Sequence, residues 1–97
     1  MARVMRFQVI IDYALLTGDE GVRMFSYKCR VGASGTNEAI VRAMEKVCLQ
    51  EAPLLSVSPN THIYWERAEW KTIYDKNFAR VDLSLLNTKG LSAVINN

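Results

Sequence analysis

The sequence predicts an α+β domain in which one amphipathic helix packs on one face of a mainly antiparallel sheet of four or five strands. Three observations predict this class. Two N-terminal segments alternate apolar and polar residues, a central segment has helical spacing, and two later segments alternate again. We expect the order strand, strand, helix, strand, strand (ββαββ), with a possible short C-terminal strand, in a single domain over residues 1–97.

The first two strands are predicted over residues 3–16 and 22–31. In the first, a period of two puts large apolar side chains on one face: Met5, Phe7, Val9, Ile11, Tyr13 and Leu15. The second repeats this pattern with Phe25, Tyr27, Cys29 and Val31. The segment Thr17–Gly21 between them contains two glycines and suits a hairpin loop. We therefore expect these strands to pair antiparallel.

A helix is predicted over about residues 37–51. Before it, Thr36 or Asn37 can cap the free amides of a first turn. One apolar stripe follows at helical spacing: Ile40, Ala43, Met44, Val47 and Cys48. Pro53 is expected to end the helix, because proline cannot extend the hydrogen-bond ladder, and residues 52–61 are expected to form a connection.

The second half of the chain predicts two more strands. Residues 62–74 favour a long or bulged strand by residue type, although a weaker helical spacing is also present. A turn at residues 75–77 leads to an alternating strand over 78–86, and a second turn follows at 87–90. The apolar residues 91–95 suit a short edge strand or a packed tail. Alternation in all the strands leaves half of their side chains open to water or to a partner.

Composition narrows the class of protein. The net charge of +2 is too small to argue for nucleic acid, and no apolar stretch approaches the ~20 residues of a membrane span. The N-terminus lacks the apolar region of a secretory signal. Cys29 and Cys48 both fall on predicted apolar faces, as expected of buried thiols in a reducing compartment. We expect a cytoplasmic protein without membrane contact.

The residues of an enzyme are not evident. His62, the single histidine, lies in no recognised catalytic context, and with two cysteines it gives no zinc-ligand spacing. A GxxG run stands before the helix, where free amides can hold an anion, but the lysine of a phosphate-binding loop is missing. A plain turn is favoured there, with a weak anion-binding candidate at Gly32, Ser34, Gly35 and Thr36. We predict a non-enzyme without catalytic residues, metal or cofactor.

Aromatic and basic residues are the best candidates for binding. The strand at 62–74 interleaves them, and its candidates are Tyr64, Trp65, Arg67, Trp70, Lys71 and Tyr74. Such residues can pack in the core, contact a protein or stack on nucleobases. On a regular strand Trp65 faces away from Trp70, so at least one large aromatic should lie off the core. Pairing of the first two strands would also gather Arg6, Lys28 and Arg30 on the outward face, near Gln8.

These features favour a small non-enzymatic binding module that acts by protein–protein contact, with a nucleic-acid-binding module that uses a basic or aromatic sheet face as the alternative. The small size and the lack of motifs are similar to those of inhibitors encoded by phages and mobile elements, among them anti-restriction and anti-CRISPR proteins, a similarity of type that covers no specific residue. An unprotected sheet edge at 78–86 or 91–95, with Leu54, Leu55 and Val57 hard to bury together, slightly favours a homodimer over a monomer.

Overall fold

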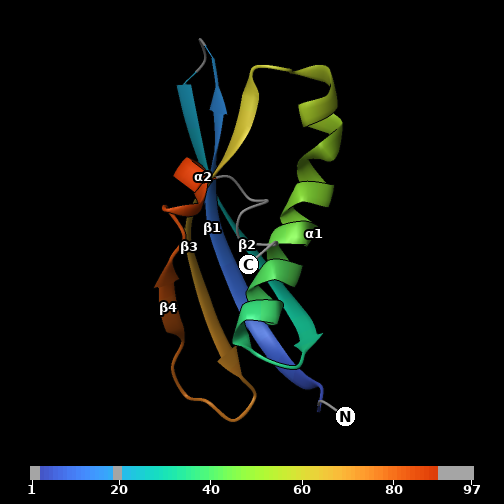
Figure 1. Ribbon diagram of the computed structural model, residues 1–97, viewed down its shortest axis with the longest axis vertical. Helices are drawn as coiled ribbons and strands as arrows, with labels where there is room; N and C mark the ends of the chain where they lie inside the picture. The colour runs from blue at the N-terminus through green and yellow to red at the C-terminus, as the bar shows by residue number, and fades with distance from the viewer. Residues whose placement is uncertain (1–2, 19–20, 90–97) are drawn as a thin grey trace.

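The computed structural model describes residues 3–18 and 21–89 (Figure 1). Its elements are β1 (Met5–Thr17), β2 (Gly21–Ala33), α1 (Thr36–Val57), β3 (Thr61–Thr72), β4 (Ala79–Asp82) and α2 (Leu86–Lys89). The four strands form one sheet in the order β2-β1-β3-β4, and every neighbouring pair is antiparallel. The α+β class and the order ββαββ are confirmed. The possible strand at 91–95 lies outside the described residues, and neither described helix is long and apolar enough to cross a bilayer.

β1 and β2 form the predicted hairpin. Their register runs without a shift from Met5 opposite Ala33 to Thr17 opposite Gly21. Gly21 has a φ of 92°, a left-handed conformation that glycine adopts without steric cost, so it suits the end of the hairpin loop. β1 then also pairs with β3, which places the N-terminal strand inside the sheet.

The core lies between α1 and one face of the sheet (Figure 1). The predicted apolar positions of β1 are buried from Phe7 to Leu15, and those of α1 from Ile40 to Val47, while Met5 and Cys48 are only partly covered. Tyr13 crosses this core, and its hydroxyl donates a hydrogen bond to Glu51 Oε2. Burial, and then the nearby Glu51 carboxylate, raise the pKa of Tyr13 well above its usual range. Cys29 and Cys48 are free and half-buried, and burial raises the pKa of both thiols.

β3 contains the predicted bulge. Arg67 pairs with Asp12 while Trp65 pairs with Tyr13, so Glu66 is an extra residue without its own partner on β1. The extra residue brings Trp65 onto the core face together with Trp70. The expectation that these two tryptophans face opposite ways is therefore wrong, because it assumed a regular strand.

α1 continues past Pro53 and ends at Val57. The prediction that Pro53 ends the helix and that a connection begins at residue 52 is wrong. Proline removes the N–H that would bond the Leu49 carbonyl, but Leu49 and Pro53 are both exposed, so water can satisfy that carbonyl. Leu54 and Val57 stay exposed on this last part of the helix, as expected from their number in so short a segment.

We expect Pro53→Ala to raise the free energy of unfolding by about 1–2 kcal/mol. Alanine restores the hydrogen bond to Leu49, and proline costs about 3 kcal/mol more than alanine inside a helix. Part of this gain is offset because proline also restricts the unfolded chain. Urea denaturation would measure the gain, provided that the dependence of the free energy of unfolding on urea concentration stays unchanged. Pro59→Ala, in the turn after α1, is the matched control and should not stabilise; equal effects of the two changes would contradict the prediction.

The segment predicted as a strand over 78–86 is shorter in the structure. β4 ends at Asp82, because Asp82 Oδ1 accepts a hydrogen bond from the Ser84 amide at 2.8 Å and turns the chain. Leu86 N then donates to the Leu83 carbonyl at 3.0 Å and α2 begins, where a simple turn was expected at 87–90. β4 does lie at one edge of the sheet, as predicted, and β2 lies at the other.

Candidate binding face of the sheet

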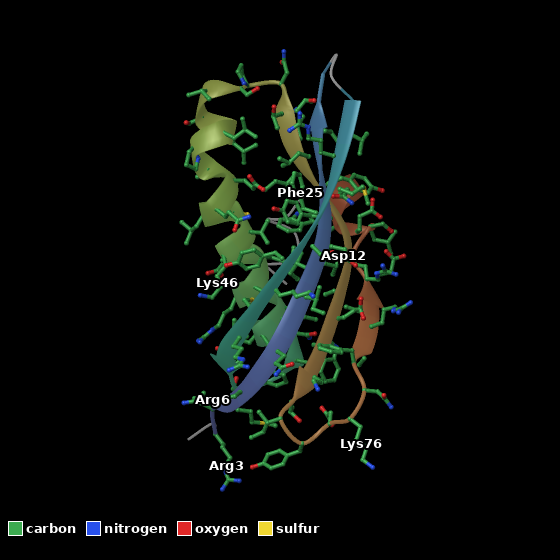
Figure 2. The ribbon with its side chains drawn as sticks, turned by 180° about the vertical axis from the view of Figure 1, so that it is seen from behind. Arg3, Arg6, Asp12, Phe25, Lys46 and Lys76 are labelled. Atoms are coloured by element: carbon green, nitrogen blue, oxygen red, sulfur yellow. The ribbon has the colours of Figure 1, made fainter. Side chains whose placement is uncertain are left out.

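One face of the sheet is covered by α1, and we call the opposite one the open face (Figure 2). It carries every second side chain of each strand. Its members are Arg6, Gln8, Ile10, Asp12, Ala14 and Leu16 on β1; Val22, Met24, Ser26, Lys28 and Arg30 on β2; His62, Tyr64, Arg67, Glu69 and Lys71 on β3; and Arg80 and Asp82 on β4. α1 lies against the other face, and of the members of the open face only Ala14 is buried.

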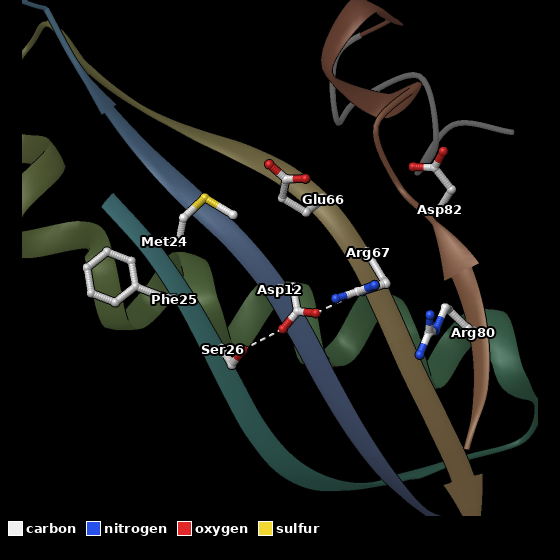
Figure 3. A pocket seen from close by; sticks show the side chains of 8 residues that line it. All are labelled: Asp12, Met24, Phe25, Ser26, Glu66, Arg67, Arg80 and Asp82. Carbon is white, nitrogen blue, oxygen red and sulfur yellow. Dashed lines mark hydrogen bonds and ion pairs between the residues drawn. The ribbon is translucent and has the colours of Figure 1, made fainter. Parts of the chain in front are cut away.

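The centre of the open face is a shallow depression of about 580 Å³ (Figure 3). Its lining residues are Asp12, Met24, Phe25, Ser26, Glu66, Arg67, Arg80 and Asp82. Asp12 accepts a hydrogen bond from Ser26 Oγ on one oxygen, and Arg67 Nε donates to the other at 3.0 Å. Because both oxygens are engaged, this carboxylate orients its neighbours on β2 and β3. The hydrogen bond to Asp12 raises the pKa of Arg67.

A second carboxylate of the depression belongs to Asp82. Hydrogen bonds from Ser84, the backbone amide first, lower the pKa of Asp82 below its usual range. Asp82 pairs with Arg67 in the register, and Arg80 stands two residues away on β4. The depression therefore presents fixed charges of both signs, a surface that suits polar groups of a partner.

The end of the open face near the N-terminus of β1 is basic. The register sets Arg30 and Lys71 on either side of Gln8, and Lys28 opposite Ile10. Arg6 lies two residues before Gln8 on β1 and therefore on the same face, so the predicted gathering of Arg6, Lys28 and Arg30 on one face is confirmed. None of these cations takes part in either of the two ion pairs found among the described residues. Lys71 instead lies over the ring of Phe78, with Nζ 5.2 Å from its centroid.

The end of the open face near the hairpin loop is apolar. Val22 and Met24 on β2 are each 61% exposed, and Leu16 and Ala14 stand opposite them on β1. Tyr64 pairs with Ala14 from the other side. The open face therefore changes along the strands from aliphatic, through hydrogen-bonded charges, to basic.

The predicted aromatic candidates do not form one patch. Trp65 is 4% exposed, and its ring centroid lies 6.3 Å from that of Tyr13. Trp70 packs edge-to-face against Phe7. Tyr64 alone reaches the open face with Arg67 and Lys71, and Tyr74 is 85% exposed in the turn after β3. Both tryptophans pack in or against the core. The two largest aromatic side chains are therefore not placed to stack on nucleobases from the open face.

The weak anion-binding candidate at the start of α1 is occupied by the protein's own groups. Ser34 donates from both its amide and its hydroxyl to Glu38 Oε2, and these bonds lower the pKa of Glu38. The helix cap is Gly35, without a side-chain hydrogen bond, so the predicted capping by Thr36 or Asn37 is wrong. Gly32 accepts from Arg42 Nη1 through its carbonyl. A carboxylate therefore already fills the place that an external anion would take.

Sequence reasoning missed the Asp12 contacts and a groove beside β2. Asp12 is the one acid on the polar side of the first strand, and that isolation among Arg6, Gln8 and Ile10 was a usable signal. The groove, of about 550 Å³, lies between β2 and α1 and is lined by Arg30, Val31, Gly32, Arg42, Glu45, Lys46 and Leu49. No group of three potential metal ligands gathers in the part of the chain that the structure describes.

Comparison with models of protein families, with curated proteins and with solved structures found no match.

Proposed function

We propose that the protein is a small binding module that acts by protein–protein contact through the open face of its sheet. The observation that carries the proposal is the exposed aliphatic pair Val22 and Met24 beside the ordered charges of Asp12 and Arg67. Protein interfaces combine an apolar centre, arginine and a polar rim in this way. A rigid sheet presents such a surface with little loss of conformational freedom on binding.

Contact with a nucleic acid is the second candidate, and one observation favours it. Arg6, Lys28, Arg30 and Lys71 collect at the basic end of the open face. Against it, Asp12, Glu69 and Asp82 stand on the same face and would repel a phosphate backbone that crossed it. Binding of this kind would weaken steeply with added salt. A role as an inhibitor, and a phage or mobile-element origin, stay predictions, as does the homodimer.

The test is affinity capture with the immobilised protein from a native lysate, with and without nuclease treatment. We expect retention of a defined protein to fall about tenfold or more in Met24→Asp, because a carboxylate replaces an exposed side chain in the apolar part of the face. Val57→Asp is the matched control, since it puts the same charge at an exposed apolar residue of α1. Equal retention by both variants would contradict the proposal, and loss of all retention on nuclease treatment would favour the nucleic-acid alternative.

A further inference from the structure

The two edges of the sheet differ in how they are closed. Where β4 ends, the Asn87 side chain continues the pairing: Trp65 N donates to Asn87 Oδ1 and Asn87 Nδ2 donates to the Trp65 carbonyl, both at 2.8 Å. At the other edge, β2 runs for 13 residues, without proline and without a register shift against β1. Natural edge strands are shortened, bulged, covered or charged, and of these devices β2 shows only its charged side chains, which repel a basic strand but admit an acidic one.

The backbone of β2 shows which of its groups face outward. Gly32 accepts from Arg42 Nη1 at 2.6 Å, so its carbonyl points away from β1. Backbone groups alternate along a strand, and therefore Val22, Met24, Ser26, Lys28 and Arg30 turn their N–H and C=O groups in the same direction. A second hydrogen bond gives the same result. Gly18 N donates to the Asn60 carbonyl, so the even-numbered residues of β1 turn their backbone groups toward β3 and the odd-numbered ones toward β2. Odd residues of β1 pair with odd residues of β2, which leaves the backbone groups of the even residues of β2 facing outward. Within the described residues, Arg42 is the one side chain that bonds this edge.

The surroundings of this edge are basic. β2 carries Arg23, Lys28 and Arg30 and no acid. The groove along β2 adds Arg42 and Lys46 from α1 together with one acid, Glu45, so cations outnumber acids there; Figure 2 shows Lys46 reaching out beside the strand. Leu49, also in the groove, is 75% exposed. A strand laid along this edge would place one row of side chains over Leu49 and Lys46 and the other row beside Lys28 and Arg30.

We propose that β2 accepts an extended acidic segment of a partner protein as a fifth strand of the sheet, an inference that rests on the proposed binding function and names the chemistry of the partner. Backbone hydrogen bonds to the outward groups of β2 would supply affinity, and carboxylates facing Lys28, Arg30 and Lys46 would supply selectivity. A second copy of this chain fits less well. Two β2 strands side by side would bring the cations of both to one seam with no carboxylate on either strand.

The probe is a capped, fluorescently labelled peptide of about nine residues in which Glu alternates with Val, long enough to cover most of such a strand. We expect it to bind, and we expect the same peptide with Lys in place of Glu to bind at least about tenfold more weakly. N-methylation of alternate amides should abolish binding when it blocks one edge of the peptide and be tolerated when it blocks the other. Tolerance of methylation at both edges would overturn strand addition.

Charge reversal on the protein tests where the peptide lies. Arg30→Glu should weaken binding about tenfold or more, whereas Lys76→Glu, the same charge change in the turn between β3 and β4 and away from β2, should alter it by less than about twofold. Thermal unfolding of each variant checks that the fold is kept. Equal losses in both variants, or a dimer in sedimentation that the peptide does not dissociate, would overturn the inference.

The outcomes separate this inference from the proposed function. If the peptide fails to bind while capture of a protein still depends on Met24, strand addition is wrong and the binding face stands. If the peptide binds with the expected edge and charge preferences while capture does not depend on Met24, the binding face is wrong and strand addition stands.

Discussion

Trp65→Ala should lower the free energy of unfolding by about 3–5 kcal/mol, the loss expected when a buried tryptophan is cut back to alanine. Trp65 lies in the core beside Tyr13, whose ring is 6.3 Å away, and it is almost completely covered. Removing it leaves a cavity between β3 and α1 that the surrounding strands can fill only in part. Since a domain of this size is stable by only about 5–15 kcal/mol, the variant should be close to unfolding at ambient temperature. Urea titration followed by circular dichroism would measure the loss.

Tyr64→Ala is the matched control for this prediction. Tyr64 precedes Trp65 directly in the chain but lies half-buried on the open face, opposite Ala14. Its truncation removes a cross-strand contact and creates no internal cavity, so we expect a loss of about 1 kcal/mol or less. Comparable losses in the two variants would show that the bulge at Glu66 does not place Trp65 in the core.

Asn87→Ala should cost about 2–3 kcal/mol, the second largest effect that we expect. The Asn87 carboxamide bonds both backbone groups of Trp65 and also donates to the Ser84 carbonyl at 3.0 Å. Alanine would leave a backbone N–H and a carbonyl unpaired in a part-buried place, at about 1–3 kcal/mol for each such group. Chemical denaturation gives the size of the loss, and hydrogen exchange at the Trp65 amide should speed up most.

An exposed asparagine provides the comparison for Asn87. Asn77 lies in the turn between β3 and β4, and Asn77→Ala should change stability by less than about 0.5 kcal/mol. If Asn87→Ala behaved in the same way, the carboxamide would not be needed to close this edge of β3.

Several elements follow from local patterns alone. The period of two in β1 identified the buried residues from Phe7 to Leu15, because a strand with one buried face exposes alternate side chains. The hairpin register then brought Arg6, Lys28 and Arg30 together without any knowledge of the other strands. The turn after Asp82 also had a local signal, since Asp commonly accepts from the amide two residues later.

Other features depend on contacts that are distant in the chain. The bulge at Glu66 shows only when β3 is aligned with Asp12 and Tyr13, and it decides which face Trp65 takes. The end of α1 depends on whether water reaches the carbonyl that Pro53 leaves unpaired, which is a property of the packed molecule. The exposed edge of β2 follows from the order of the strands, and no local pattern encodes that order.

The central place of β1 has a consequence for how the chain folds as it is synthesised. β1 leaves the ribosome before β3, and all of β2 and α1 must follow before its second edge can be paired. Until then the nascent hairpin has a row of unpaired backbone groups on β1 in addition to the row on β2. The β1–β3 pairing also closes a long loop, so we expect it to be the slow step, and formation of α1 within that loop should shorten the distance to be closed. During that interval the apolar side chains and unpaired strand edges of the nascent hairpin favour aggregation.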